Sequence, residues 1–470
     1  MCSTAMGERM SVRRGMRCGN GWSAAGGLLA ALLVLGWPDA AHAEQKKPLD
    51  TNTIFRLDTL LARADLWSIT TNNFGAAVRG GGFFWVNKEQ TTARGGEDTL
   101  LSFLDQRVWE ALVQFESGRV SRVDVSFYNH GDAGALSPKA FTALLDKISA
   151  ALSNWTSVAS APLPDVLGPS RAKIQRQMWG KSPTRLELEW SVTRQHIQSG
   201  KQIEYRAEFI RLKVLPSAIS QTARMALPKP VLARTAITLK SHVQTSTNGD
   251  VVIRDVPMVD QGDKGYCAAA VMARVMGYYG MDFDMHQAAQ VAGTEAKGGT
   301  QGESLRDALK RIALKSNLHF LPLQNLDTYE LQRLCAEYNR LAKSARKPKV
   351  SLEEADYHLD KLLDSMDAEL LRQARTKRTN DLNKLKADVT KYVDLGIPLI
   401  WDVYLGLVKE VFLLPQDRGG HLRMIIGYNK KSGDIFYTDT WGPRHECKQM
   451  PLADALTMTF GLYVIKPNSL

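Results

Sequence analysis

The sequence lacks several patterns that would point directly to a broad class of protein. After residue 43 no stretch reaches the roughly 18 consecutive apolar residues that span a bilayer, so we expect no stable membrane insertion. The formal net charge is +11, but the basic residues are mixed with acidic ones and form no basic-aromatic motif, which argues against nucleic-acid binding. The chain also has no internal repeat and no extended low-complexity tract.

Signals of a cofactor are missing as well. Residues 44–215 have few histidines, no metal-ligand spacing and no glycine-rich phosphate loop. The run His445-Glu446-Cys447 is too sparse for a zinc site, which would need about four ligands. The sequence therefore implies no cofactor.

An export signal is predicted at the amino terminus. Three arginines precede an apolar run from Ala24 to Trp37, and Ala41-His42-Ala43 fits a signal peptidase site. No cysteine lies at the cleavage point, which argues against a lipoprotein. We predict that residues 1–43 are a signal peptide and that the protein is exported, either to a periplasm or to the medium.

Cysteine is scarce. Of five cysteines, Cys2 and Cys18 would leave with the signal peptide, and Cys267, Cys335 and Cys447 would remain. An odd number of cysteines in an oxidising compartment indicates one free thiol. If Cys267 is that thiol, Cys335 and Cys447 are available for a disulfide; the alternative is two unpaired structural thiols.

The chemistry-bearing part of the sequence begins with a polar loop from Asp260 that is broken by glycines and ends at Cys267. Apolar residues at helical spacing predict a helix from Cys267 to Gly280, which places the thiol in its first turn. Free amide groups and the positive end of the helix dipole favour a thiolate there. Gln261 is expected to fold back and form an oxyanion hole with the Cys267 backbone N–H. The alternative role for such a cysteine is that of a small buried hydrophobic residue.

A second cluster lies far downstream, in a pattern of strand, turn and strand from Gly419 to Gly442. A hairpin turn near Gly433 would make His421 and Asp439 neighbours. Asp439 would then hold the tautomer and orientation of the imidazole while the other ring nitrogen faces Cys267. Trp441 would cover the His–Asp hydrogen bond, or it is simply a core aromatic. Asp434 could compete for His421, although it lies at the wrong end of the hairpin.

In the order Gln261, Cys267, His421 and Asp439 the chain resembles the papain-like cysteine peptidases, whose catalytic domain runs Gln, Cys, His, then Asn or Asp. It looks most similar to the branch that includes the double-glycine leader peptidases, family thirty-nine of the cysteine peptidases, and their secreted relatives. That branch has a Gly-x-Pro strand, a Gly-His strand and a Gly-Tyr turn, which match Gly396-Ile397-Pro398, Gly420-His421 and Gly427-Tyr428.

The resemblance implies that Cys267 is the nucleophile, His421 the general base, Asp439 the orienting residue and Gln261 the oxyanion donor. It covers roughly residues 250–470. Three alanines follow Cys267 where relatives often have Gly-Pro or Gly-Ser, and Asp439-Thr440-Trp441-Gly442 looks more like the Asn-Ser-Trp-Gly of papain. A preference for double-glycine sites is therefore not transferable.

The predicted fold class is α+β, and the composition is that of a globular protein of two or three domains. We expect an accessory or pro-domain at 44–215, a linker at 216–249, and a papain-like domain at 250–470 with a helical half and an antiparallel sheet. Within the last domain, charged helical periodicity predicts an inserted helical hairpin at about 326–393, either a lid over the cleft or a solvated structural insertion. In the first domain we predict strands at 82–86, 120–127, 185–190 and 208–214, and helices at 99–107 and 137–155.

The expected function is that of an exported cysteine peptidase that hydrolyses bonds in a peptide or protein substrate. One alternative is another papain-fold acyl transferase, similar to a transglutaminase or a phytochelatin synthase, because the same triad serves any acyl acceptor once water is excluded. The other alternative is a catalytically silent peptide-binding module.

Overall fold

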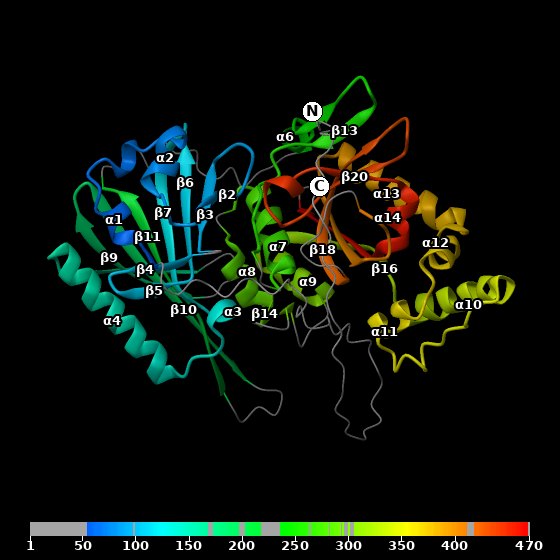
Figure 1. Cartoon of the computed structure of the whole chain (residues 1–470), viewed down its shortest axis with the longest axis horizontal. Coiled ribbons are helices and arrows are strands. Elements are labelled where there is room, and N and C mark those ends of the chain that lie inside the picture. Colours follow the sequence, from blue (N-terminus) through cyan, green and yellow to red (C-terminus); the bar gives the residue numbers. More distant parts are fainter. Residues whose placement is uncertain are drawn as a thin grey trace.

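The chain forms two lobes that lie side by side in the computed structural model (Figure 1). The structure describes residues 54–96, 99–167, 173–196, 203–217, 236–262, 265–281, 283–292, 294–295, 299–300, 305–410 and 418–468. The predicted signal peptide lies outside these residues. Helices and antiparallel sheets occur together, so the α+β class is confirmed. Among the described helices, none combines the length and the apolar character needed to cross a membrane.

The first lobe is built on an eight-stranded antiparallel sheet in the order β2-β3-β6-β7-β11-β10-β9-β8. A smaller sheet, β1-β4-β5, lies beside it, and helix α4 packs across the large sheet (Figure 1). The strands are β1 (Ile54–Arg56), β2 (Phe84–Trp85), β3 (Thr92–Gly95), β4 (Leu100–Phe103), β5 (Gln106–Val108), β6 (Glu110–Glu116), β7 (Arg119–Asn129), β8 (Ala161–Leu167), β9 (Lys173–Lys181), β10 (Thr184–His196) and β11 (Ile203–Pro216). The helices are α1 (Leu57–Leu61), η1 (Leu66–Ser68), α2 (Thr71–Ala77), α3 (His130–Ala133) and α4 (Pro138–Thr156).

Local sequence explains most of this lobe. In β7 the alternation of buried Val123 and Val125 with the partly exposed Arg122 and Asp124 is the period of a strand with one buried face. Helix α4 starts as predicted, because the Ser137 hydroxyl accepts a hydrogen bond from the Ala140 amide at 3.2 Å and a proline occupies the first turn.

One helix prediction in this lobe is wrong. Residues 99–107 form not a helix but the hairpin of β4 and β5. Leu101 and Phe103 are buried on alternate positions, which is strand periodicity, and Leu104 and Asp105 make the turn with φ of 52° and 57°. A two-residue turn with both φ values positive fits the right-handed twist of the two strands that it joins. Such turns usually contain glycine or asparagine, and the sequence Leu104-Asp105 has neither, so the hairpin could not be recognised from the sequence.

The second lobe is built on a sheet in the order β12-β13-β18-β17-β21-β16, to which β19 and β20 are added beside β18. The strands are β12 (Val243–Thr245), β13 (Asp250–Ile253), β14 (Thr294–Glu295), β15 (Gly299–Thr300), β16 (Leu318–Asn325), β17 (Leu399–Leu405), β18 (Gly419–Asn429), β19 (Ile435–Thr438), β20 (Lys448–Met450) and β21 (Thr459–Pro467). The helices are α6 (Ala236–Lys240), α7 (Cys267–Tyr278), α8 (Met285–Ala292), α9 (Leu305–Lys315), α10 (Thr328–Ala345), α11 (Leu359–Asp364), α12 (Ala368–Thr376), α13 (Thr379–Asp394), η2 (Pro443–His445) and α14 (Leu452–Met458).

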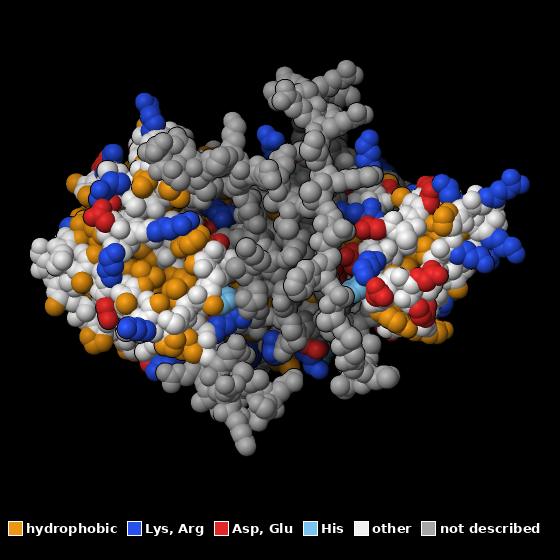
Figure 2. All heavy atoms as spheres, turned by 60° about the horizontal axis from the view of Figure 1, so that its bottom comes forward, with side chains coloured by type: hydrophobic (Ala, Val, Ile, Leu, Met, Phe, Trp, Pro, Cys, Tyr) orange, Lys and Arg blue, Asp and Glu red, His pale blue; other side chains and the backbone are white. Residues whose placement is uncertain are grey.

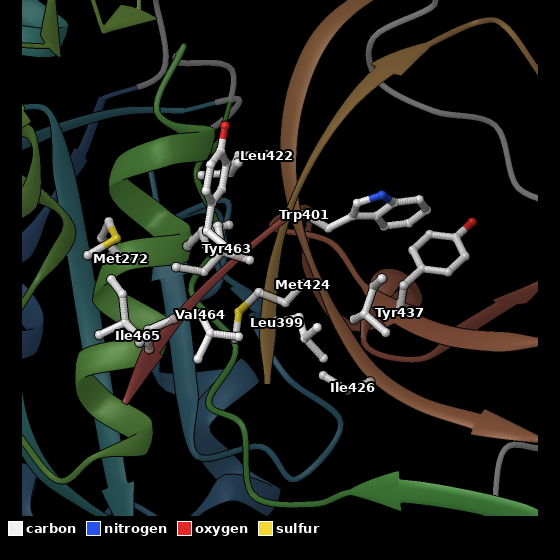
Figure 3. Packing of buried hydrophobic residues seen from close by; sticks show 14 of the residues in the cluster. Met272, Leu399, Trp401, Leu422, Met424, Ile426, Tyr437, Tyr463, Val464 and Ile465 are labelled. Atoms are coloured by element: carbon white, nitrogen blue, oxygen red, sulfur yellow. The ribbon is translucent and has the colours of Figure 1, made fainter. Parts of the chain in front are cut away.

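The core of this lobe lies between the sheet and helix α7. Figure 3 shows Met272 of α7 beside Ile465 of β21, while Trp401 and Tyr437 lie on the other side of the strands. The segment after Cys267 is buried all around because its three alanines are small enough for the sheet to approach. Part of the predicted linker belongs to this lobe, since β12 pairs with β13 and Leu239 of α6 joins the core.

The predicted helical insertion divides into two parts. Helices α10, α11 and α12 share a separate apolar cluster with Tyr404, Leu407 and Phe460. Helix α13 instead buries Leu385 and Val389 in the main core. The insertion is therefore not a simple helical hairpin. Its first three helices form a separate subdomain, and its last helix, α13, belongs to the main core of the lobe (Figure 1). On the face shown in Figure 2, acidic and basic side chains of the described residues are interspersed over both lobes.

Candidate active site

Cys267 is the first residue of α7, as the sequence predicts. Its sulfur lies against β18, where the backbone amide of Leu422 points at it together with the amide of Ala268. Strands β13 and β19 pair with β18 only from Met424 onward, so the edge of β18 at Leu422 is open to the thiol. The nucleophile candidate therefore sits beside the residue that follows His421.

The ionisation of this thiol differs from the sequence prediction. Cys267 is only 7% exposed, and burial raises its pKa to about 12, although the two amides oppose that rise. The negative charges of Asp402 and Asp439 add to the increase. The described conformation thus favours a neutral thiol, because desolvation outweighs the helix terminus that was expected to stabilise a thiolate.

His421 and Asp439 meet at the end of the hairpin formed by β18 and β19. Nε2 of His421 lies 2.8 Å from Oδ1 of Asp439, and both side chains are fully buried. The pKa of Asp439 is held well below its usual range by Arg423 and Lys448, so the group is a carboxylate and can only accept hydrogen bonds. Nε2 must therefore carry the proton and donate it.

The other ring nitrogen is consequently the basic one. Nδ1 of His421 is buried and, within the part of the chain that the structure describes, has no hydrogen-bond partner. An unprotonated nitrogen left unpaired in a buried position is unusual, because its lost hydration is not replaced. His421 directly precedes Leu422 in β18, and the Leu422 amide points at the sulfur of Cys267.

Trp441 lies on the imidazole. The two rings stack with centroids 4.2 Å apart and an angle of 12° between their planes. The indole therefore limits the rotation of His421 and shields the bond between Nε2 and Asp439 from water. Asp434, the competing carboxylate, instead accepts a hydrogen bond from Gln449 at 2.8 Å at the other end of the hairpin.

Gln261 is anchored beside the same strand end. Its backbone amide donates to the Thr440 carbonyl at 2.9 Å, and its side-chain Oε1 accepts from the Thr440 hydroxyl at 2.5 Å. Because Oε1 of Gln261 accepts from Thr440, the side-chain Nε2 points away from the Thr440 hydroxyl. Cys267 thus lies at the start of α7, while His421, Asp439 and Gln261 are held at the end of the hairpin.

Sequence reasoning missed a buried charge cluster around Asp439. Arg423 lies 3.0 Å from Oδ1 of Asp439, and the Lys448 ammonium contacts Oδ2. Both cations also approach Glu410, which accepts from Arg423 at 3.0 and 3.1 Å and from the Tyr437 hydroxyl at 2.5 Å. Two carboxylates balance two cations in a core that water does not reach, which makes the arrangement tolerable there.

A sequence signal for this cluster exists. Arg423 follows His421 by two residues in an otherwise apolar strand, so it lies on the same face of β18 as His421. A charge in a fully buried strand requires a partner of opposite sign. The cluster lowers the pKa of His421, because burial, Arg423 and Lys448 together outweigh the attraction of Asp439.

Arg274 joins the two parts of the site. This fully buried side chain extends from α7 and donates to the Asp439 carbonyl at 2.6 Å, to the Thr438 hydroxyl at 2.7 Å and to the Pro257 carbonyl at 2.7 Å. Burial lowers its pKa to about 10, so it stays charged at neutral pH. It therefore fixes α7, which carries Cys267, relative to the end of β19 and the following Asp439.

The first lobe also contacts the site. Arg94 of β3 pairs with Glu110 at 2.8 Å and donates to the Asp260 carbonyl at 3.3 Å, next to Gln261. Tyr266, the residue before Cys267, places its hydroxyl so close to Gly131 that any Cβ there would overlap it. The accessory lobe thus braces both ends of the loop that leads to the nucleophile.

The disulfide considered from the sequence does not form, because Cys335 is a free buried thiol in the second apolar cluster. His445, the first residue of the His-Glu-Cys run, packs beside Lys448 with Nδ1 3.3 Å from the ammonium. Among the described residues there is no group of three or more His, Cys, Asp or Glu side chains that could hold a metal ion.

No family model and no curated protein matches this chain.

Replacement of Arg274 by methionine should destabilise the protein. Three buried acceptors would lose their donor, and each unsatisfied group costs about 1–3 kcal/mol, so we expect a loss of about 3 kcal/mol or more. Urea unfolding followed by tryptophan fluorescence measures this change. Arg340→Met is the matched control, since Arg340 pairs with Glu337 on an exposed face and should contribute under about 1 kcal/mol. Equal midpoints for the two variants would contradict the structural role of Arg274.

Substitution of Gly131 by alanine should disturb the nucleophile from the other lobe. The added methyl group would displace Tyr266 and with it Cys267, so we expect alkylation of Cys267 to change by about tenfold or more while secondary structure persists. In a Tyr266→Ala background the same substitution should have little further effect, because the overlap is gone. Additive effects of the two substitutions would show that Gly131 acts by another route.

Proposed function

We propose that this protein is an exported cysteine peptidase that cleaves peptide bonds by acyl transfer to Cys267. The observation that carries the proposal is the state of His421: its tautomer is set by Asp439, and its basic Nδ1 is buried without a partner next to Leu422, whose amide points at the sulfur. A buried base beside a thiol at a helix start is the arrangement that activates a cysteine nucleophile.

The reaction would begin from a neutral pair. As Sγ of Cys267 attacks the carbonyl carbon of the scissile amide, Nδ1 of His421 takes the thiol proton. The carbonyl π electrons move to oxygen, and the backbone N–H of Cys267 with the side-chain amide of Gln261 would receive that oxyanion. The carbon–nitrogen bond then breaks, and the imidazolium returns its proton to the leaving amine.

Water completes the cycle. His421, neutral again, removes a proton from a water molecule that attacks the thioester, and the second tetrahedral intermediate expels the thiol of Cys267 with release of the carboxylic acid. The charge cluster has a specific consequence here. Because Arg423 and Lys448 lower the pKa of His421, its protonated form is a stronger acid than an ordinary imidazolium and protonates the leaving amine readily.

An acyl transferase is the second candidate, and one observation favours it. His421 and Asp439 are completely buried, and a site that excludes water suits a thioester that waits for an amine or thiol acceptor. Product analysis in the presence of an added amine separates the two activities. A peptide-binding module without chemistry is the third candidate, supported by the high pKa of the thiol.

The primary test is labelling with an epoxide probe of cysteine peptidases, followed by intact mass and peptide mapping. We expect one adduct on Cys267 in the mature protein, none there after Cys267→Ala, and at least about a hundredfold slower labelling after His421→Ala, since general-base help is typically worth 10²–10⁴-fold. Cys335→Ala is the matched control, because Cys335 is also a buried free thiol but lies away from the site.

Two results would overturn the proposal. An unlabelled Cys267 in the mature protein would mean an inert thiol and would favour the binding module. Labelling that His421→Ala leaves unchanged would mean that His421 is not the base.

The pH dependence gives a separate prediction. The active form of His421 is the neutral base, so activity is lost as pH falls through its pKa, and because that pKa is lowered, the acid limb of labelling should lie below pH 6.5. Lys448 contributes to the lowering, so Lys448→Met should move the acid limb to higher pH. A limb that moves to lower pH in Lys448→Met would contradict this account of the cluster.

A further inference from the structure

A buried carboxylate outside the predicted triad lies close to Cys267. Asp402 is in the middle of β17, directly opposite Leu422 of β18 and Gly461 of β21. Residues that pair directly in an antiparallel sheet present their side chains to the same face, so Asp402 shares a face with the Leu422 side chain. Figure 3 shows Leu422 on the side of the sheet where α7 and Tyr463 lie.

Electrostatics also place Asp402 near the nucleophile. Its charge raises the pKa of the Cys267 thiol and that of the Tyr463 hydroxyl. Gly461, the residue opposite Asp402 on β21, has no side chain, and the Tyr463 ring occupies the space above it. A Cβ at position 461 would overlap the Tyr463 hydroxyl. Asp402, Gly461 and Tyr463 therefore lie on the face of the sheet that also carries the Leu422 side chain.

Asp402 differs from the other buried acids in having no partner. Its residue is 6% exposed, and among the described residues no side chain or backbone group bonds to its carboxyl. In the part of the chain that the structure describes, the other acidic side chains that are buried each have a basic partner: Glu110 with Arg94, Glu187 with Arg185, Glu189 with Arg211, Glu208 with Arg206, and Asp439 and Glu410 with Arg423. Burial without compensation raises the pKa of Asp402 to about 7.

A structural role does not account for this residue. An apolar side chain would fill the position without the cost of burying an unpaired carboxyl. Asp402 cannot replace Asp439 as the orienting group, because His421 and Leu422 are consecutive on β18 and so point to opposite faces. A single carboxylate is also too few ligands for a metal ion. The remaining explanation is a cationic group that arrives with the substrate.

Resting on the proposed peptidase function, we propose that Asp402 is a specificity residue that binds the ammonium or guanidinium group of a Lys or Arg side chain in the substrate. That side chain would belong to a residue near the carbonyl that Cys267 attacks, on the face of the sheet shared by Leu422 and Tyr463. Pairing would give the carboxylate its missing partner and would add binding energy only for substrates with a basic side chain at that position.

The test is a comparison of wild-type and Asp402→Asn proteins on fluorogenic peptides. Each set places Lys, Arg, Gln or norleucine at one position on the acyl side, and norleucine matches the length of lysine without its charge. We expect wild-type kcat/KM to favour Lys or Arg at one position by tenfold or more. Asp402→Asn should remove that preference while the norleucine peptide changes by less than about threefold.

Matched variants separate charge from folding. Asp434→Asn removes an acid from the solvent-facing end of the hairpin and should keep the preference for basic peptides. Asp402→Leu should fold even if the asparagine variant does not, because it places an apolar group in a buried position, and it should also lack the preference. Labelling of Cys267 by the neutral epoxide probe should persist in both Asp402 variants.

Several outcomes would overturn the inference. Equal wild-type rates for basic and norleucine peptides would do so, as would a basic preference that survives Asp402→Asn. Loss of probe labelling in both Asp402 variants would mean that Asp402 acts on the thiol and not on the substrate. By contrast, a wild-type protein that cleaves no peptide and accepts no probe at Cys267 would remove the peptidase proposal itself, which is a different result.

Discussion

The arrangement of the candidate site depends on one buried guanidinium. Arg274 leaves the nucleophile helix and bonds to the end of β19 and to the Pro257 carbonyl, so three segments far apart in sequence share one rigid point. A planar side chain with five fixed donors suits this task, because it holds several acceptors in set directions at once. Without it, the helix that carries Cys267 would lose its direct hydrogen bonds to Thr438 and Asp439, and apolar packing is far less directional.

The second constraint is the balance of charge around Asp439. Its carboxylate is shared between His421, Arg423 and Lys448, and Glu410 compensates the two cations in turn. The pKa of the Cys267 thiol is raised and that of the His421 imidazole is lowered, so both groups are neutral at rest. Under the proposed function, proton transfer would have to accompany attack on the substrate, because the resting thiol is neutral.

Local patterns in the sequence predicted the parts of the site that are local. The helix at Cys267 and the approach of His421 to Asp439 follow from periodicity and from a short hairpin. The thiolate was a wrong prediction, because desolvation depends on what covers the helix start, and that comes from distant β18. The hairpin at 100–108 was missed since its turn lacks the usual residues. The acidic partners of Arg423 are Glu410 and Asp439, which lie outside β18 at distances that no sequence period reveals.

The contact between Gly131 and Tyr266 has a consequence for how such a chain can change over time. A glycine in one lobe accommodates the residue that precedes Cys267 in the other, so position 131 cannot gain a side chain while Tyr266 is present. The two lobes are therefore expected to evolve together. Replacing or removing the first lobe would alter the site, even though all four candidate catalytic residues lie in the second lobe.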